Sequence, residues 1–268
     1  MKGDLIMRFG MPTLLETKSL EECAKLCSDL GLEFIEINMN FPEYQNKFDL
    51  KHLSEISEKF GLYYTIHLDE KLSPCDFNER VADAYTETVL MAIETAIKLD
   101  VPIINMHLAD GVYITLPDKR AFLFDEYIDV YIGKLTKFRD RCEKAIGNTD
   151  VKICVENTGG YNRAGFLGKS IEVLLESPAF ALTYDIGHDA AAGFVDGTVI
   201  KGFSGRLCHM HVHDANGKNV HLALGDGRLD LLKYLDIAKK NNCRMVLETK
   251  TVEALTSSVQ WLKKKEML

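Results

Sequence analysis

Eight short apolar runs alternate with longer segments of helical spacing along the chain, and this alternation restricts the fold more than any other feature of the 268 residues. We expect strands at residues 5–10, 34–38, 63–68, 103–108, 152–157, 181–186, 207–213 and 244–249. Eight strand-then-helix units of about 30 residues each are typical of a closed parallel barrel. The sequence therefore predicts an α/β fold, a (β/α)8 TIM barrel, in preference to an open doubly wound sheet. Since no Pro- or Ser-rich linker interrupts the series, we expect a single domain over residues 1–268.

The segments between the runs carry helix signals. Ser19 and Gly31 bracket a segment with glutamates in its first turn, a pattern that predicts a capped helix. Residues 78–100 repeat apolar side chains at helical spacing over several turns. Trp261 lies on the apolar face of the last helix, where we expect it to help close the barrel rather than form a dimer contact, although a homo-oligomer stays open.

Charge and cysteine content narrow the function. The chain has 32 Lys and Arg against 40 Asp and Glu, which gives a formal net charge of −8. No overall positive potential therefore attracts nucleic acid, but this total charge does not exclude a local basic groove. Its seven cysteines are an odd number without the paired spacing of a disulfide framework or a CxxC zinc site.

No apolar core of the kind found in signal peptides and no run of about 20 apolar residues is present. We expect a cytoplasmic protein with no membrane partner.

Ligand-type side chains recur where the expected strands end. Six of them, each on a different strand, are His67, His107, Glu156, Asp185, His211 and Glu248. In a TIM barrel these ends form the mouth that carries the chemistry. Since side chains alternate along a strand, apolar neighbours of these residues should face the helices instead. Those neighbours are Ile104, Met106, Ile153, Val155, Cys208, Met210 and Val212.

Four of the eight histidines lie between residues 207 and 227. His209, His211 and His213 share one face of the seventh strand, so we expect them to point into the barrel at successive heights, with His213 at the rim. Only one height can match a metal that the other strands also bind.

Carboxylates and imidazoles that converge on one cavity suit a divalent cation with mixed oxygen and nitrogen ligands, such as Mn²⁺, Co²⁺ or Zn²⁺, better than Ca²⁺. Without a cation, Glu156, Asp185 and Glu248 would repel one another in a medium of low dielectric constant. The pattern therefore predicts a metal site.

Five short segments carry a resemblance to a known superfamily. They are VEN at 155–157, DIGH at 185–188, MHVHD at 210–214, HLALGDG at 221–227 and LET at 247–249. In order and spacing the chain resembles the xylose-isomerase-like TIM barrel superfamily, from Phe34 to Glu248. Its members include sugar isomerases and epimerases, dehydratases and the DNA-repair enzyme endonuclease IV.

The resemblance to the epimerases implies one divalent metal held by Glu156, Asp185, His211 and Glu248. It also implies that Glu156 and Glu248 act as proton acceptor and donor around a metal-stabilised enediolate. His188 and His213 would bind the substrate, a sugar or sugar phosphate. Epimerases often carry an arginine shortly after the metal-binding histidine, and the segment DANGKNVH has none. This absence argues against a ketose 3-epimerase in particular.

The resemblance to endonuclease IV implies two or three zinc ions instead. His67 and His107 with Glu156 would form one further site, and His188 with His221 part of another. Asn219 stands where the repair enzymes have an aspartate. The loop MNFPEYQNKF lacks the Arg and Trp expected of a loop that probes DNA.

We rank a metal-dependent isomerase or epimerase of carbohydrate metabolism first and an abasic-site phosphodiesterase second. A dehydratase or other lyase, and a sugar-binding protein without turnover, follow.

Overall fold

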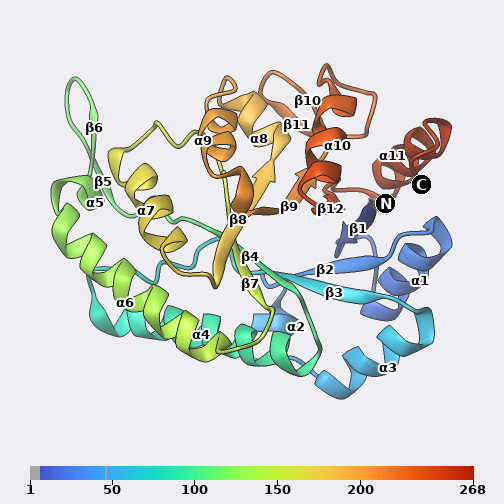
Figure 1. Ribbon diagram of the computed structural model, residues 1–268, viewed down its shortest axis with the longest axis horizontal. Helices are drawn as coiled ribbons and strands as arrows, with labels where there is room; N and C mark the ends of the chain where they lie inside the picture. Colours follow the sequence, from blue (N-terminus) through green and yellow to red (C-terminus); the bar gives the residue numbers. More distant parts are fainter. Residues whose placement is uncertain (1–6, 46) are drawn as a thin grey trace.

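The computed structural model describes residues 7–45 and 47–268, and these residues form one closed parallel barrel surrounded by helices (Figure 1). The barrel strands are β1 (Arg8–Pro12), β2 (Phe34–Asn38), β3 (Tyr63–His67), β4 (Ile103–His107), β7 (Lys152–Glu156), β8 (Phe180–Asp185), β9 (Leu207–Val212) and β12 (Arg244–Leu247). β1 pairs with both β2 and β12, which closes the ring. The predicted TIM barrel is confirmed. Within the described residues, no helix has the length and apolar character needed to cross a membrane.

Eight helices cover the outside of the barrel, one after each barrel strand. They are α1 (Leu20–Leu30), α3 (Leu50–Phe60), α4 (Glu79–Lys98), α6 (Ile128–Ile146), α7 (Gly165–Leu175), α9 (Asp196–Gly202), α10 (Leu231–Lys240) and α11 (Val252–Lys264). Both helices singled out in the sequence are present. Ser19 caps α1 by accepting a hydrogen bond from the Glu22 amide, and Gly31 ends it in the left-handed conformation.

Shorter elements lie in the loops between these units. They are the helices α2 (Pro42–Gln45), α5 (Leu123–Glu126) and α8 (Ile186–Ala191), the 3₁₀ turn η1 (Ser204–Arg206), and the hairpins β5 (Tyr113–Thr115)–β6 (Arg120–Phe122) and β10 (Asp214–Asn216)–β11 (Asn219–Leu222). Neither hairpin was predicted, because each pair of strands is shorter than the strand patterns that periodicity resolves. Of the predicted first strand, residues 8–10 belong to β1, Met7 does not, and residues 5 and 6 lie outside the described residues.

The main hydrophobic core lies between the barrel and its helices. The outward strand residues expected there, Ile104, Met106, Ile153, Val155, Met210 and Val212, are all buried in it. Trp261 packs on this core and on the loop at Gly225, where an added Cβ would lie 2.7 Å from the indole Cδ1 atom. Trp261 therefore serves the packing of α11 on the barrel, as expected.

Cys208 does not face the helices, so that expectation was wrong. Leu182 pairs with Leu207 but Thr183 pairs with His209, so β9 holds one extra residue there, a β-bulge. The bulge turns Cys208 into a small cluster with Ile103, Cys154 and Ala181, and its Sγ atom lies 3.2 Å from that of Cys154. By strand alternation this cluster belongs to the lower interior of the barrel.

The interior of the barrel changes from apolar to polar towards the mouth. Near the floor, the Phe34 ring stacks on Tyr63 with centroids 5.1 Å apart, and the Arg244 guanidinium lies 5.7 Å from the Tyr63 ring centre. Above them comes a buried polar layer of Glu36, Thr65, Asn105, Thr183 and His209. The ligand-type residues lie above this layer.

Gly10 provides a test of the floor packing. A Cβ at this position would lie 2.5 Å from the Phe34 ring, so we expect Gly10→Ala to lower the free energy of unfolding by about 1–3 kcal/mol. Gly168→Ala on α7 is the matched control, because nothing lies within 4 Å of its Cβ and we expect a gain of about 0.5–1 kcal/mol. Urea unfolding measures both. Equal stability of Gly10→Ala and the parent would contradict this packing.

Candidate active site

Six ligand-type side chains from six different strands meet at the mouth of the barrel. They are His67, His107, Glu156, Asp185, His211 and Glu248. The first four end β3, β4, β7 and β8, His211 is the next to last residue of β9, and Glu248 directly follows β12. His107 is half-buried and the other five are buried. The structure thus brings together the residues that the sequence places at strand ends.

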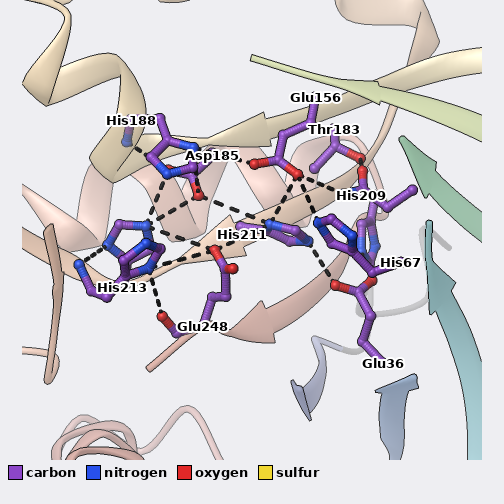
Figure 2. A network of polar contacts seen from close by, with 12 residues as sticks. Glu36, His67, Glu156, Thr183, Asp185, His188, His209, His211, His213 and Glu248 are labelled. Carbon is purple, nitrogen blue, oxygen red and sulfur yellow. Dashed lines mark hydrogen bonds and ion pairs between the residues drawn. The ribbon is translucent and has the colours of Figure 1, made fainter. Parts of the chain in front are cut away.

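His211 lies in the middle of this cluster (Figure 2). Its Nδ1 atom is 3.3 Å from Glu156 Oε2, 3.3 Å from Glu248 Oε2 and 3.9 Å from Asp185 Oδ2. Burial favours the neutral ring, but Glu156, Glu36 and Glu248 raise the pKa of His211 well above its ordinary value. Three buried acids therefore share a single imidazole nitrogen.

Glu156 is held by a chain of buried amide and hydroxyl groups. Asn105 Nδ2 donates to Glu156 Oε2 at 2.5 Å, and Thr183 Oγ1 donates to Asn105 Oδ1 at 2.5 Å. Burial would raise the pKa of Glu156, but His211 and His107 hold it well below its ordinary value. Glu156 is therefore ionised at neutral pH.

On the other side of Glu156 lie His67 and His107. The carbonyl oxygen of Leu68 is 2.7 Å from His67 Nδ1, so this nitrogen carries the proton and Nε2 is left as an acceptor. His67 Nε2 and His107 Nε2 lie 3.5 Å and 3.1 Å from the same Glu156 oxygen. Ligand atoms of these three residues all lie within 4.8 Å of one another, so they form a second group able to hold a cation.

Asp185 is fixed by its own helix and by His213. It caps α8 by accepting the His188 amide at 2.6 Å, and His213 Nε2 lies 3.1 Å from both of its oxygens. The His221 amide donates to His213 Nδ1 at 2.8 Å, so Nδ1 is unprotonated. The proton of the ring is on Nε2, which donates to Asp185. A Cβ at Gly187 would lie 1.9 Å from this ring, which explains the glycine.

His188 and His221 flank the centre at the rim. His188 Nδ1 lies 3.2 Å from Glu156 Oε1 and 3.4 Å from Asp185 Oδ2. His221 lies on β11 with φ of 59°, a strained value for a non-glycine residue, and its Nδ1 lies 3.0 Å from the Glu248 carbonyl oxygen. Asn219, on the same strand, is exposed.

The three histidines of β9 do point into the barrel at successive heights. His211 lies level with the acids, His213 supports Asp185 above it, and His209 Nε2 contacts Glu36 Oε2 below at 2.9 Å. The sequence reasoning missed Glu36. Strand alternation could have found it, since Ile35 and Ile37 beside it are buried in the outer core.

The donor set fits a divalent cation. Within the described part of the chain, several buried polar atoms here make no hydrogen bond: Glu156 Oε1, His188 Nδ1, His211 Nδ1 and Nε2, and Glu248 Oε2. Unpaired buried carboxylate and imidazole atoms are costly unless something charged joins them. Asp185, His211 and Glu248 have ligand atoms within 4.8 Å of one another, and mixed oxygen and nitrogen donors suit Mn²⁺, Co²⁺ or Zn²⁺.

A cavity of about 330 Å³ opens beside this cluster. Glu248, His67 and Glu36 line it together with Lys250, whose Nζ atom lies 2.8 Å from Glu248 Oε1. A larger cavity of about 860 Å³ runs between α9 and α10, and its lining residues come from outside the cluster. We assign the chemistry to the smaller cavity because two of the six ligand-type residues, His67 and Glu248, line it, and the larger cavity has none of the six.

Comparisons with known proteins agree with the fold. Residues 24–265 match the family model described as Xylose isomerase-like TIM barrel. The chain is 27% identical to the uncharacterized protein MJ1311 of Methanocaldococcus jannaschii, over 98% of this chain and 90% of that protein. A D-tagatose 3-epimerase-like protein superposes with a TM-score of 0.79 at 23% identity, with 96% of each chain covered. The IOLI protein with a binding zinc atom gives 0.70 at 19% identity, with 97% of this chain and 96% of that chain covered.

The acid cluster predicts how metal-free protein responds to pH. Burial favours neutral His188, but Asp185 and Glu156 raise its pKa from 6.5 to about 9. The protonated ring thus stabilises the fold fully below pH 6.5, and this contribution is lost as the pH rises through about 9. We expect urea unfolding of chelator-treated protein to show a loss of about 3 kcal/mol from this group.

The matched variants are His188→Gln at the site and His52→Gln on the exposed face of α3. The first should remove the part of the pH dependence that comes from His188, and the second should leave the pH dependence as in the parent. A parent protein whose stability is the same at pH 6.5 and pH 9 would disprove the electrostatic account of His188.

Proposed function

Because the chain belongs to the xylose isomerase-like TIM barrel family, we propose that it is a divalent-metal-dependent isomerase or epimerase of a sugar or sugar phosphate. The observation that carries the proposal is the environment of His211 Nδ1. This atom makes no hydrogen bond within the described residues, and oxygens of Glu156, Glu248 and Asp185 lie between 3.3 and 3.9 Å from it. The likeness to a D-tagatose 3-epimerase-like protein and to a zinc-binding protein of the same fold supports it.

Glu156, Asp185, His211 and Glu248 would hold the cation. When bound, it supplies a Lewis acid that polarises a substrate carbonyl and lowers the pKa of the adjacent C–H bond. Each glutamate has one oxygen engaged by the protein and one that makes no hydrogen bond within the described residues. The free oxygens are Glu156 Oε1 and Glu248 Oε2.

Proton transfer falls to the two glutamates, which flank His211 from β7 and from the end of β12. In an epimerisation one carboxylate takes the proton from one face of the sugar carbon and the other returns a proton to the opposite face. Both carboxylates have a pKa held well below the ordinary value in the absence of metal, although burial opposes this, so both begin ionised. The glutamate that donates must therefore first take up a proton from solvent, and the glutamate that accepts the substrate proton returns one to solvent after the reaction.

The cavity suits a small substrate. At about 330 Å³ it lies at the low end of the range for small-molecule sites, which is about 300–1,000 Å³. We propose that His188, whose side chain is partly exposed at the rim, contacts a substrate hydroxyl. Since both ring nitrogens of His213 are engaged by the protein, we assign it to the support of Asp185 rather than to substrate.

The group of His67, His107 and Glu156 favours a second candidate, a zinc phosphodiesterase acting on abasic DNA, because it adds a further cation site. The net charge of −8 and the exposed, neutral Asn219 weigh against it. We therefore rank it second.

Glu156→Gln and Glu248→Gln test the acid–base assignment. We expect each to slow exchange of the substrate C–H proton with D₂O by about 10²–10⁴-fold, because the amide cannot take up a proton. NMR across a panel of aldoses, ketoses and their phosphates measures the exchange, and elemental analysis checks bound metal. Glu55→Gln on the exposed face of α3 is the control. Exchange at the parental rate in both site variants would rule out this mechanism.

Metal stoichiometry separates the two candidates. We expect close to one equivalent of divalent metal and no cleavage of an oligonucleotide that contains an abasic site. Two or three equivalents, together with cleavage that a chelator abolishes, would reverse the ranking.

A further inference from the structure

Glu36 is a fully buried carboxylate in the polar layer beneath the acid cluster, and neither the acid–base steps nor the four ligands account for it. It lies in the middle of β2, a strand that is otherwise apolar up to Asn38. A buried carboxylate is costly unless several donors surround it. Its partners therefore indicate its role.

Three donors surround Glu36, and two of them are histidines of the same strand. Thr65 Oγ1 donates to Oε2 at 3.0 Å, and His209 Nε2 lies 2.9 Å from the same oxygen. His211 Nε2 lies 2.9 Å from Oε1. The Thr65 and His209 contacts are hydrogen bonds, and the His211 contact is a close ion-pair contact. Each oxygen of Glu36 therefore lies against a ring nitrogen of one histidine, Oε2 against His209 and Oε1 against His211.

This arrangement determines which nitrogen His211 offers to the cluster. If Nε2 carries the proton that faces Glu36, Nδ1 is left as a lone pair directed at Glu156 and Glu248, each 3.3 Å away. Ligating histidines are commonly oriented by a carboxylate on their other ring nitrogen. His209 completes the support because it occupies the second oxygen of Glu36.

We infer that Glu36 is a positioning residue, which holds His211 as the Nε2–H tautomer and thereby presents Nδ1 to the cation. The inference rests on the proposed metal-dependent function for its consequence, but the contact between Glu36 and His211 Nε2 is present in the metal-free protein. Glu36 is expected to touch neither the cation nor the reacting atoms of the substrate.

Glu36→Gln tests the inference sharply. A Gln amide has one acceptor oxygen and one NH₂ group, so it cannot present an acceptor oxygen to both His209 and His211. We expect a long-range ¹H–¹⁵N NMR spectrum of the metal-free protein, recorded at a pH high enough to make the His211 ring neutral, to show the Nε2–H tautomer in the parent and a mixed or reversed ring in the variant. We also expect Co²⁺ affinity, followed by visible absorption, to fall by about 10–100-fold.

Glu33→Gln is the matched control, because Glu33 immediately precedes β2 at the opposite end of the barrel. It should retain the parental tautomer and Co²⁺ affinity. Glu36→Asp keeps the charge but moves it away from the histidines by the length of one methylene, so its Co²⁺ affinity should lie between those of the parent and Glu36→Gln. This variant provides the test if Glu36→Gln does not fold. Thermal melts confirm that the compared variants are folded.

The outcomes separate the two proposals. A parent that binds no Co²⁺ contradicts the proposed function, while the NMR spectra still decide the role of Glu36. A parent that binds Co²⁺, with variants of unchanged His211 tautomer and affinity within about twofold, overturns the inference about Glu36 alone.

Discussion

The crowding of carboxylates around one imidazole nitrogen is the constraint on which the rest of this structure depends. Glu156, Asp185 and Glu248 come from different strands and converge on His211 within 4 Å, and all three are buried. In such surroundings like charges repel strongly unless a positive charge joins them. The hydrogen bonds from Asn105 to Glu156 and from the His188 amide to Asp185 hold the acids in place despite this repulsion.

The barrel explains why residues so distant in sequence meet. Parallel strands end at one rim, so a ligand at the last position of each strand needs no long loop to reach its partners. The outward neighbours of these ligands are buried under the helices, and this packing fixes the strands that carry the acids. The binding groups therefore belong to the rigid part of the molecule, and the loops supply the walls of the cavity.

Strand order and the six ligand-type residues could be predicted from the sequence because both follow from periodicity and from the end of each strand. Cys208 could not, since a β-bulge depends on how two strands pair and leaves no mark on the alternation of β9 itself. Glu36 was within reach of the same alternation rule, but it lies in mid-strand rather than at the rim. The tautomers of His67 and His213 depend on a carbonyl and an amide whose positions only the folded chain determines.

Hydrogen bonds connect the hairpin of β10 and β11 at the rim to the acid cluster at the mouth of the barrel. Its His221 amide donates to His213, and His213 donates to Asp185, so the backbone of an outer loop influences how strongly an inner acid holds its negative charge. Insertions or substitutions in the turn at 217–218 would be transmitted along this relay. Substitutions in this hairpin would therefore change the affinity for a cation in related chains that keep all the same ligands.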